Sequence, residues 1–254
     1  MRQEGTHVII QARMGSTRLP GKILKPFIGE YTPLMWLVER AQGSAIAGKV
    51  IVATTTNPKD DATEAACKAM GCDVYRGSED NVLDRYLQAI RTFDSKVILQ
   101  INGDEPFVDI AEMDRLGQTL IEQGLDYANN HPTALPLGTG SEAYTRESYE
   151  KMASLTNDPY DLENITPYYY NHPDLFKQTI LEPKERHAFA KEARMTLDTT
   201  EDFEFLQKLA EGMGFSNPKD QPSTGEILSY LEAHPELVAI NKNVVQKTFP
   251  KAGI

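Results

Sequence analysis

A loop rich in cations follows the first apolar segment of the chain, residues 8–10. Its charged residues are Arg13, Arg18, Lys22 and Lys25. No acidic residue lies between Gly5 and Gly29, although the whole chain has a net charge of −11. Gly15 and Gly21 let the backbone approach a ligand, and successive amide N–H groups in such a loop can surround an anion. Because arginine and lysine side chains together bind polyphosphates, we predict a nucleoside triphosphate site here; the alternative is a solvated basic loop.

Two aspartates, Asp104 and Asp198, each follow an apolar segment and precede a polar one. A carboxylate that faces a triphosphate is a ligand for Mg²⁺, which binds one or two carboxylates together with phosphate oxygens. These two acids and the cationic loop predict metal-assisted transfer of a nucleotidyl group. Lys22 and the arginines would stabilise the pyrophosphate that leaves. The alternative for each aspartate is a structural role as a helix N-cap.

Strand-like and helix-like segments alternate through the first half of the chain. Continuous apolar runs predict strands at residues 8–11, 49–55, 73–75, 96–101 and 126–129. Between them, amphipathic patterns predict helices at residues 33–41, 58–71, 82–93 and 110–123. This order is typical of an α/β fold with a mostly parallel (mixed) sheet and helices on both faces. Ligands bind such sheets beyond the carboxyl ends of the strands, where the cationic loop and Asp104 fall.

The alternation loosens after about residue 130. We expect helices near residues 146–155 and 162–170, a strand at 177–181 and a charged loop at 183–192. A further strand at residues 194–198 would end at Asp198 and lead into a helix at 203–213. A polar linker, a helix at residues 225–233 and an irregular tail complete the chain.

Composition excludes several classes of protein. A chain of 254 residues with 40% hydrophobic residues can bury the core of one globular domain. Its acidic balance argues against a nucleic-acid-binding surface, and no apolar run approaches the roughly 20 residues that span a membrane. Cys67 and Cys72 match no zinc pattern. Without a signal-peptide core at the N-terminus, we expect a cytoplasmic protein with reduced thiols.

Residues 8–22 closely resemble the opening motif of the cytidylyltransferases that make CMP-linked sugar acids, a family that includes the 3-deoxy-manno-octulosonate and acylneuraminate enzymes. The greater likeness is to the branch of spore-coat polysaccharide biosynthesis cytidylyltransferase-like proteins. Residues 51–55, 76–86, 136–142 and 196–203 also look like that branch. The likeness runs in order from about residue 8 to residue 209.

The resemblance implies a fold of the nucleotide-diphospho-sugar transferase (nucleotidyltransferase) type, CTP as donor, Mg²⁺ as cofactor and release of pyrophosphate. It assigns the catalytic roles to Arg13, Lys22, Asp104 and Asp198, the two aspartates being the metal ligands. The nucleotide contacts that it implies are Gln11, Ala12, Arg13, Gly15, Ser16, Arg18, Lys22, Arg76, Ser78, Arg85 and Asn102. Within this set, Ser78 and Arg85 would lie near the cytosine and the ribose.

The acceptor side is the least constrained part of the resemblance. Its expected residues are Glu142, Glu163, Asn164 and Tyr168, with Arg146 as a further candidate. For all of these except Glu142, a solvated helix position is the alternative. Asn164 stands where the branch usually has histidine. The family is usually dimeric through an inserted acceptor and dimerisation segment, here residues 131–190. Residues 214–254 would then form a C-terminal helix and tail of the single domain 1–254. For His131, His172 and His187 we expect only loop roles.

The main functional hypothesis is therefore transfer of CMP from CTP to a 2-keto-3-deoxy sugar acid, of nonulosonate or octulosonate type, for cell-surface polysaccharide. An arginine or lysine of the second half would hold the acceptor's carboxylate. One alternative is another small acidic acceptor, such as a phosphonate or sugar phosphate. A glycosyltransferase would normally carry an Asp-x-Asp pair, which the segment Asp104-Glu105-Pro106 lacks. A non-catalytic CTP-binding protein would not need Lys22, Asp104 and Asp198 together.

Overall fold

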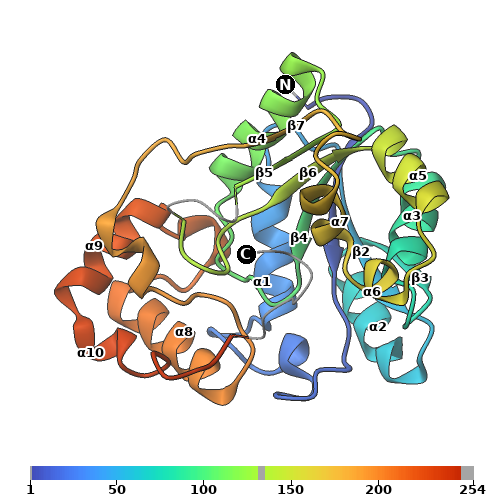
Figure 1. Cartoon of the computed structure of the whole chain (residues 1–254). Helices are drawn as coiled ribbons and strands as arrows, with labels where there is room; N and C mark the ends of the chain where they lie inside the picture. Colours follow the sequence, from blue (N-terminus) through green and yellow to red (C-terminus); the bar gives the residue numbers. More distant parts are fainter. Residues whose placement is uncertain (1, 131–134, 247–254) are drawn as a thin grey trace.

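A computed structural model describes residues 2–130 and 135–246, which fold around one seven-stranded sheet (Figure 1). The strands are β1 (Thr6–Gln11), β2 (Lys49–Thr55), β3 (Asp73–Gly77), β4 (Val97–Asn102), β5 (Tyr127–Asn129), β6 (Glu142–Thr145) and β7 (Gln178–Ile180). Their order is β3-β2-β1-β4-β6-β5-β7. Neighbours pair in parallel except that β6 is antiparallel to both β4 and β5. The expected mixed, mostly parallel sheet is confirmed.

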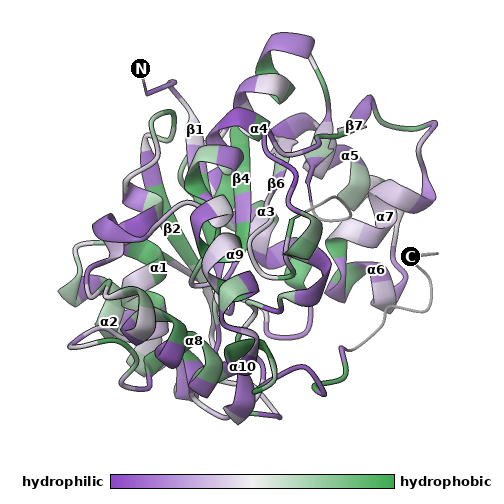
Figure 2. Cartoon of the chain, turned by 90° about the vertical axis from the view of Figure 1, so that its left-hand side faces the viewer, coloured by the Kyte–Doolittle hydropathy of each residue, from purple (hydrophilic) through white to green (hydrophobic). Residues whose placement is uncertain are grey.

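Helices cover both faces of this sheet. One face packs against α1 (Pro33–Gln42), α2 (Asp61–Ala69) and α4 (Ile110–Gln123). The other packs against α3 (Val82–Thr92), α5 (Arg146–Leu155), α6 (Pro159–Glu163) and α7 (Ile165–Asn171). Successive side chains of β1 alternate between the two faces, Val8 and Ile10 to one and Ile9 to the other. The strands β1, β2 and β4 therefore bury apolar side chains on both faces, and the hydrophobic colour of β2 and β4 is visible in Figure 2.

The C-terminal helices form a third apolar cluster beside the sheet. They are α8 (Thr200–Met213), α9 (Thr224–Ala233) and α10 (Pro235–Val238), and they lie together on one side of the molecule (Figure 1). Trp36 of α1 is fully buried in this cluster, where its ring contacts those of Phe107 and Phe215. The Trp36 indole N–H donates to the Gln221 side chain at 3.0 Å. One large aromatic side chain thus links the helices after residue 200 to the main sheet.

The remaining short elements are the 3-10 helices η1 (Lys22–Leu24), η2 (Pro58–Asp60), η3 (Ala188–Glu192) and η4 (Pro218–Asp220). In the two described ranges, no helix is both long enough and apolar enough to cross a bilayer. Residues 131–134 and 247–254 lie outside the described residues. The first range includes His131, for which a loop role is expected, and the start of the segment 131–190; the second is the end of the tail.

The structure differs from the expected elements at several places, among them η3 within the expected loop at residues 183–192. The sequence pattern missed β6, because its four residues include Glu142 and Thr145 and so lack an apolar run. The expected helix at residues 162–170 is two helices, α6 and α7, which meet at Asn164. The expected strand at residues 194–198 is wrong. This segment does not pair with any strand of the sheet and makes one isolated β-bridge, between Leu137 and Arg194.

Residues 194–198 instead cross the loops that follow β4 and β5. Backbone bonds join Met195 N–H to Leu137 O and Leu197 N–H to Asp104 O, both at 2.7 Å. Gly138 has a φ of 92°, and a Cβ at this position would lie 2.4 Å from the Thr196 nitrogen. Only glycine fits this crossing. The crossing brings the end of the segment, Asp198, beside Asp104.

Candidate active site

A buried carboxylate, that of Asp60, fixes the loop after β1. Asp60 of η2 accepts a hydrogen bond from the Met14 N–H at 2.7 Å and another from the Thr55 hydroxyl. Gly21 adopts a left-handed φ of 69° and begins the turn that leads into η1. The loop therefore has a set path before any ligand binds. The sequence did not indicate that Asp60 anchors this loop, because an acidic residue near the start of a helix is already favoured by the helix dipole.

Lys22 is the centre of the site. Its side chain is buried, with the whole residue 7% exposed. The Nζ atom lies 2.8 Å from Asp104 Oδ2 and 3.1 Å from Asp198 Oδ1, and it donates to Leu197 O at 2.6 Å. Three segments far apart in the sequence thus meet at one ammonium. The structure brings together three of the four residues expected to be catalytic, Lys22, Asp104 and Asp198; Arg13 is exposed on the loop.

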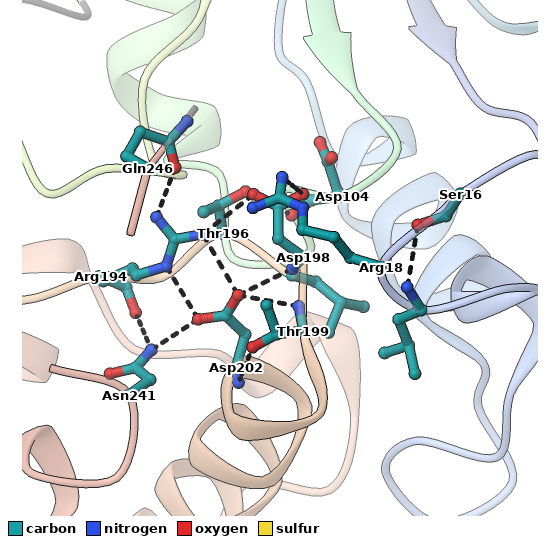
Figure 3. Close-up of polar contacts among 12 residues, drawn as sticks. Ser16, Arg18, Asp104, Arg194, Thr196, Asp198, Thr199, Asp202, Asn241 and Gln246 are labelled. Carbon is teal, nitrogen blue, oxygen red and sulfur yellow. Dashed lines mark hydrogen bonds and ion pairs between the residues drawn. The ribbon is translucent and has the colours of Figure 1, made fainter. Parts of the chain in front are cut away.

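Asp198 binds two further cations. Arg18 Nη2 lies 2.9 Å from its Oδ1 atom, and Arg194 Nη2 lies 2.9 Å from its Oδ2 atom (Figure 3). Burial by itself raises the pKa of the Asp198 carboxyl, but attraction by Lys22, Arg18 and Arg194 outweighs it and holds that pKa below its usual value. The three cations therefore keep the Asp198 carboxyl in its ionised form.

Neither Asp104 nor Asp198 is a helix cap. Asp109 caps α4, where its side chain accepts from the Glu112 N–H at 3.0 Å. Thr199 caps α8 in a capping box with Asp202. The N-cap alternative for the two aspartates is thereby excluded, and their carboxylates instead pair with cations of the site.

A second polar group lies where β1 and β4 end side by side. Gln11 is paired in register with Asn102, and their side-chain amides are joined by a 3.3 Å hydrogen bond. Arg85 of α3, which is 1% exposed, donates to Gln11 Oε1 at 3.0 Å and to the Ser78 carbonyl. Burial lowers the pKa of its guanidinium. The polar residues expected near a nucleobase, apart from Arg76, therefore form one connected group next to the cationic loop.

The sequence profile of the cytidylyltransferase family matches residues 7–221 of the chain. The chain belongs to the cytidylyltransferase family. It is accordingly a nucleotidyltransferase that uses CTP, and its fold matches that of a solved cytidylyltransferase.

Individual relatives agree with this assignment. The spore coat polysaccharide biosynthesis protein SpsF of Bacillus subtilis is 37% identical over 234 residues, which cover 90% of this chain and 94% of that protein. A 3-deoxy-manno-octulosonate cytidylyltransferase of Bdellovibrio bacteriovorus is 38% identical over 117 residues, 45% of each chain. The solved structure of a cytidylyltransferase from Leptospira borgpetersenii superposes with a TM-score of 0.86 at 31% identity, covering 97% of this chain and all of that one.

In this cytidylyltransferase the remaining residues of the nucleotide loop have different surroundings. Arg13 is exposed at the loop surface beside Gly15. The Ser16 hydroxyl accepts from the Leu19 N–H at 3.3 Å and so shapes the turn. Ala12 is buried and its N–H donates to Ala53 O at 3.3 Å. Contacts of these residues with the nucleotide stay predictions.

Arg76 lies apart from this group. Its guanidinium pairs with Asp61 at 2.7 Å and Glu64 at 2.8 Å, both on α2, and donates to Thr55 O at 2.9 Å. These bonds hold α2 against the end of β3. Arg76 therefore has structural contacts in this fold, and its expected contact with the nucleotide stays a prediction.

The four expected acceptor residues have different surroundings, although Glu142 contacts Thr166 at the start of α7. Glu142 is buried on β6, where it accepts from Gln100 Nε2 at 2.8 Å and from the hydroxyls of Tyr144 and Thr166 at 2.7 and 2.6 Å. The other three belong to α6 and α7. Glu163 is exposed, the Asn164 amide donates to Tyr160 O at 3.0 Å, and Tyr168 packs into the core against α3 and α5.

Arg146 is excluded as an acceptor contact at this edge. Its N–H donates to Lys96 O, at the amino end of β4, and its guanidinium pairs with Asp94 at 2.9 Å. It therefore lies at the opposite edge of the sheet from Lys22. His172 stacks on Tyr168, and His187 begins η3, which agrees with the local roles expected for them.

We predict that Asp198→Asn lowers the free energy of unfolding at pH 7 and abolishes turnover without unfolding the chain. The pKa of Asp198 is depressed in the folded state, so its stabilising effect is present above the unfolded pKa of about 3.9 and is lost as the pH falls through the lower folded value. Urea unfolding at pH 7 and at about pH 3.5 measures this. Asp174→Asn, at an exposed turn, is the control. A stability difference that is the same at both pH values would contradict the assignment.

Proposed function

We propose that this cytidylyltransferase transfers CMP from CTP to a 2-keto-3-deoxy sugar acid, of nonulosonate or octulosonate type, for cell-surface polysaccharide. The observation that carries the proposal is the Lys22–Asp104–Asp198 cluster, which lies at the carboxyl ends of β1 and β4 beside the buried group of Gln11 and Arg85. Relatives named for spore coat polysaccharide biosynthesis and for 3-deoxy-manno-octulosonate support the choice of acceptor class.

The proposed step is a displacement at the α-phosphorus of CTP. A hydroxyl oxygen of the acceptor forms a new bond to that phosphorus while the bond to the β-phosphate oxygen breaks. Pyrophosphate leaves with the bonding electron pair, and the hydroxyl proton passes to water. Lys22, Arg18 and Arg13 provide positive charge where negative charge develops on the leaving group.

Lys22 and Arg18 are bound to carboxylates of the protein. A triphosphate carries the same kind of charge, and it therefore competes with Asp104 and Asp198 for these cations. The free-energy cost of holding these cations in place is met during folding, before CTP binds. This preorganisation is the source of electrostatic catalysis at the site.

We propose Mg²⁺ as the cofactor, with Asp104 and Asp198 as its protein ligands. The two carboxylates converge on one cation, the Lys22 ammonium, which shows that their arrangement suits a positive charge. The described residues form no cluster of three or more metal-binding side chains, so the cation would complete its coordination with phosphate oxygens and water. When bound, Mg²⁺ supplies neutralisation of the phosphate charge.

We further propose that the enzyme acts as a homodimer in the cytoplasm. The segment 131–190 contains β7, the edge strand of the sheet, on which Ile180 is exposed. An open strand edge with an exposed apolar side chain is suited to pairing with another chain. Cys67 and Cys72 are both free thiols, which suits a reducing compartment.

The direct test of the proposed function is pyrophosphate release from CTP and Mg²⁺ with a panel of 2-keto-3-deoxy sugar acids, a sugar phosphate and a phosphonate. We predict release with at least one sugar acid, and a loss of about 100-fold in kcat/KM for CTP in Lys22→Ala. Lys25→Ala, an exposed cation of the same loop, serves as the matched control and should retain activity. Release only with the phosphonate or sugar phosphate, or equal effects of the two substitutions, would contradict the proposal.

Glu142 allows a separate test of the acceptor side. We predict that Glu142→Gln raises the KM for the acceptor about tenfold and leaves the KM for CTP unchanged, because Glu142 is a buried acceptor of hydrogen bonds away from the phosphate loop. Steady-state kinetics with each substrate varied in turn measures the two constants. Glu163→Gln, on the exposed side of α6, is the comparison. If only that variant changes the acceptor KM, the acceptor lies toward α6 instead.

A further inference from the structure

The C-terminal tail returns to the active site. Asn241 follows α10 and is 1% exposed, although it lies beyond residues 7–221, the part of the chain that the family profile matches. Its side-chain amide donates to the Arg194 carbonyl at 2.9 Å and to Asp202 Oδ1 at 3.0 Å. A single residue of the tail thus makes two buried hydrogen bonds to the segment that carries Asp198 (Figure 3).

Asp202 is the next member of this chain of contacts. It is fully buried at the start of α8 and accepts from Arg194 Nε at 2.9 Å, from the Asp198 N–H at 2.9 Å and from the Thr199 N–H at 3.0 Å. A buried carboxylate persists only where donors satisfy it. The Asn241 amide is one of these donors, so the tail helps to keep Asp202 in this position.

Arg194 transmits this arrangement to Asp198. Its guanidinium is buried and bridges two carboxylates, with Nε on Asp202 and Nη2 on Asp198 Oδ2. The planar guanidinium fixes the angle between its partners, which an ammonium would not do. With Oδ2 held by Arg194, Asp198 directs Oδ1 toward Lys22 and Arg18, the place where phosphate and metal are proposed to bind.

We infer that Asn241 is a positioning residue of the active site, which acts through Asp202 and Arg194 to set the orientation of the Asp198 carboxylate. The inference rests on the proposed role of Asp198 as a Mg²⁺ ligand. Residues that orient a metal ligand typically change metal affinity or activity by 10–100-fold when they are replaced. The tail is therefore part of the catalytic apparatus of this chain, and its sequence sets how tightly the metal-nucleotide complex binds.

The test is a titration of the full-length protein with Mg²⁺ at saturating CTP, in which the melting temperature is measured at each Mg²⁺ concentration. Asn241→Ala should raise the Mg²⁺ concentration for half-maximal stabilisation about tenfold, while stabilisation by CTP without Mg²⁺ stays at its wild-type value. Asn241→Gln, which keeps the amide, should restore part of the affinity. Asn243→Ala, an exposed position in the same tail, is the matched control and should titrate like the wild type.

The outcomes separate the inference from the proposed function. If the wild type shows no Mg²⁺-dependent stabilisation with CTP, the proposed metal-dependent function is wrong. If the wild type titrates and Asn241→Ala titrates at the same concentration, or loses metal-free CTP binding in equal measure, the positioning role is wrong and the function stands. Should Asn241→Ala fail to fold, Arg194→Lys provides the same measurement, because it keeps the charge and removes the planar bridge. If Arg194→Lys requires the same Mg²⁺ concentration as the wild type, the inference is wrong.

Discussion

The structure depends on one buried interaction, the contact of the Lys22 ammonium with the carboxylates of Asp104 and Asp198. Removing such charges from water costs several kcal/mol per ion, and the cost is recovered only when the partners are placed well. A shift of any of the three segments would leave an unpaired buried charge. The parallel β1–β4 pairing and the close crossing at Gly138 are the features that prevent such a shift.

The same interaction explains why the site suits a nucleotide. A fold that keeps cations and carboxylates in contact has already removed much of their water, so an incoming triphosphate exchanges one set of charged partners for another. Asp198 contributes most to this balance, because three cations contact it and hold its pKa low. The neighbouring Gln11–Asn102–Arg85 group adds directional hydrogen bonds. The cation-carboxylate cluster and this hydrogen-bonded group are thus adjacent but built from different residues.

Much of this was predictable from the sequence where local signals were strong. The cationic loop, the apolar strands β1, β2 and β4, and the aspartates after apolar segments predicted the Lys22 cluster and the sheet edge that bears it. Long-range contacts left no such signal: β6 is short and polar, and the bridge through Arg194, Asp202 and Asn241 joins residues up to 47 positions apart. The contacts of Arg76, on β3, left no signal for the same reason, because its partners Asp61 and Glu64 lie on α2.

The central claim is that this cluster binds CTP through its triphosphate and a metal. The most direct measurement compares the melting temperatures of the wild type and Asp104→Asn with CTP, UTP, ATP and GTP, each with and without Mg²⁺. Binding to the folded state raises the melting temperature, and the increase grows with the logarithm of ligand concentration over Kd. The account predicts a selective increase with CTP that grows with Mg²⁺ in the wild type and loses its Mg²⁺ dependence in Asp104→Asn. An equal increase with UTP, or a Mg²⁺ effect that survives in the variant, would contradict it.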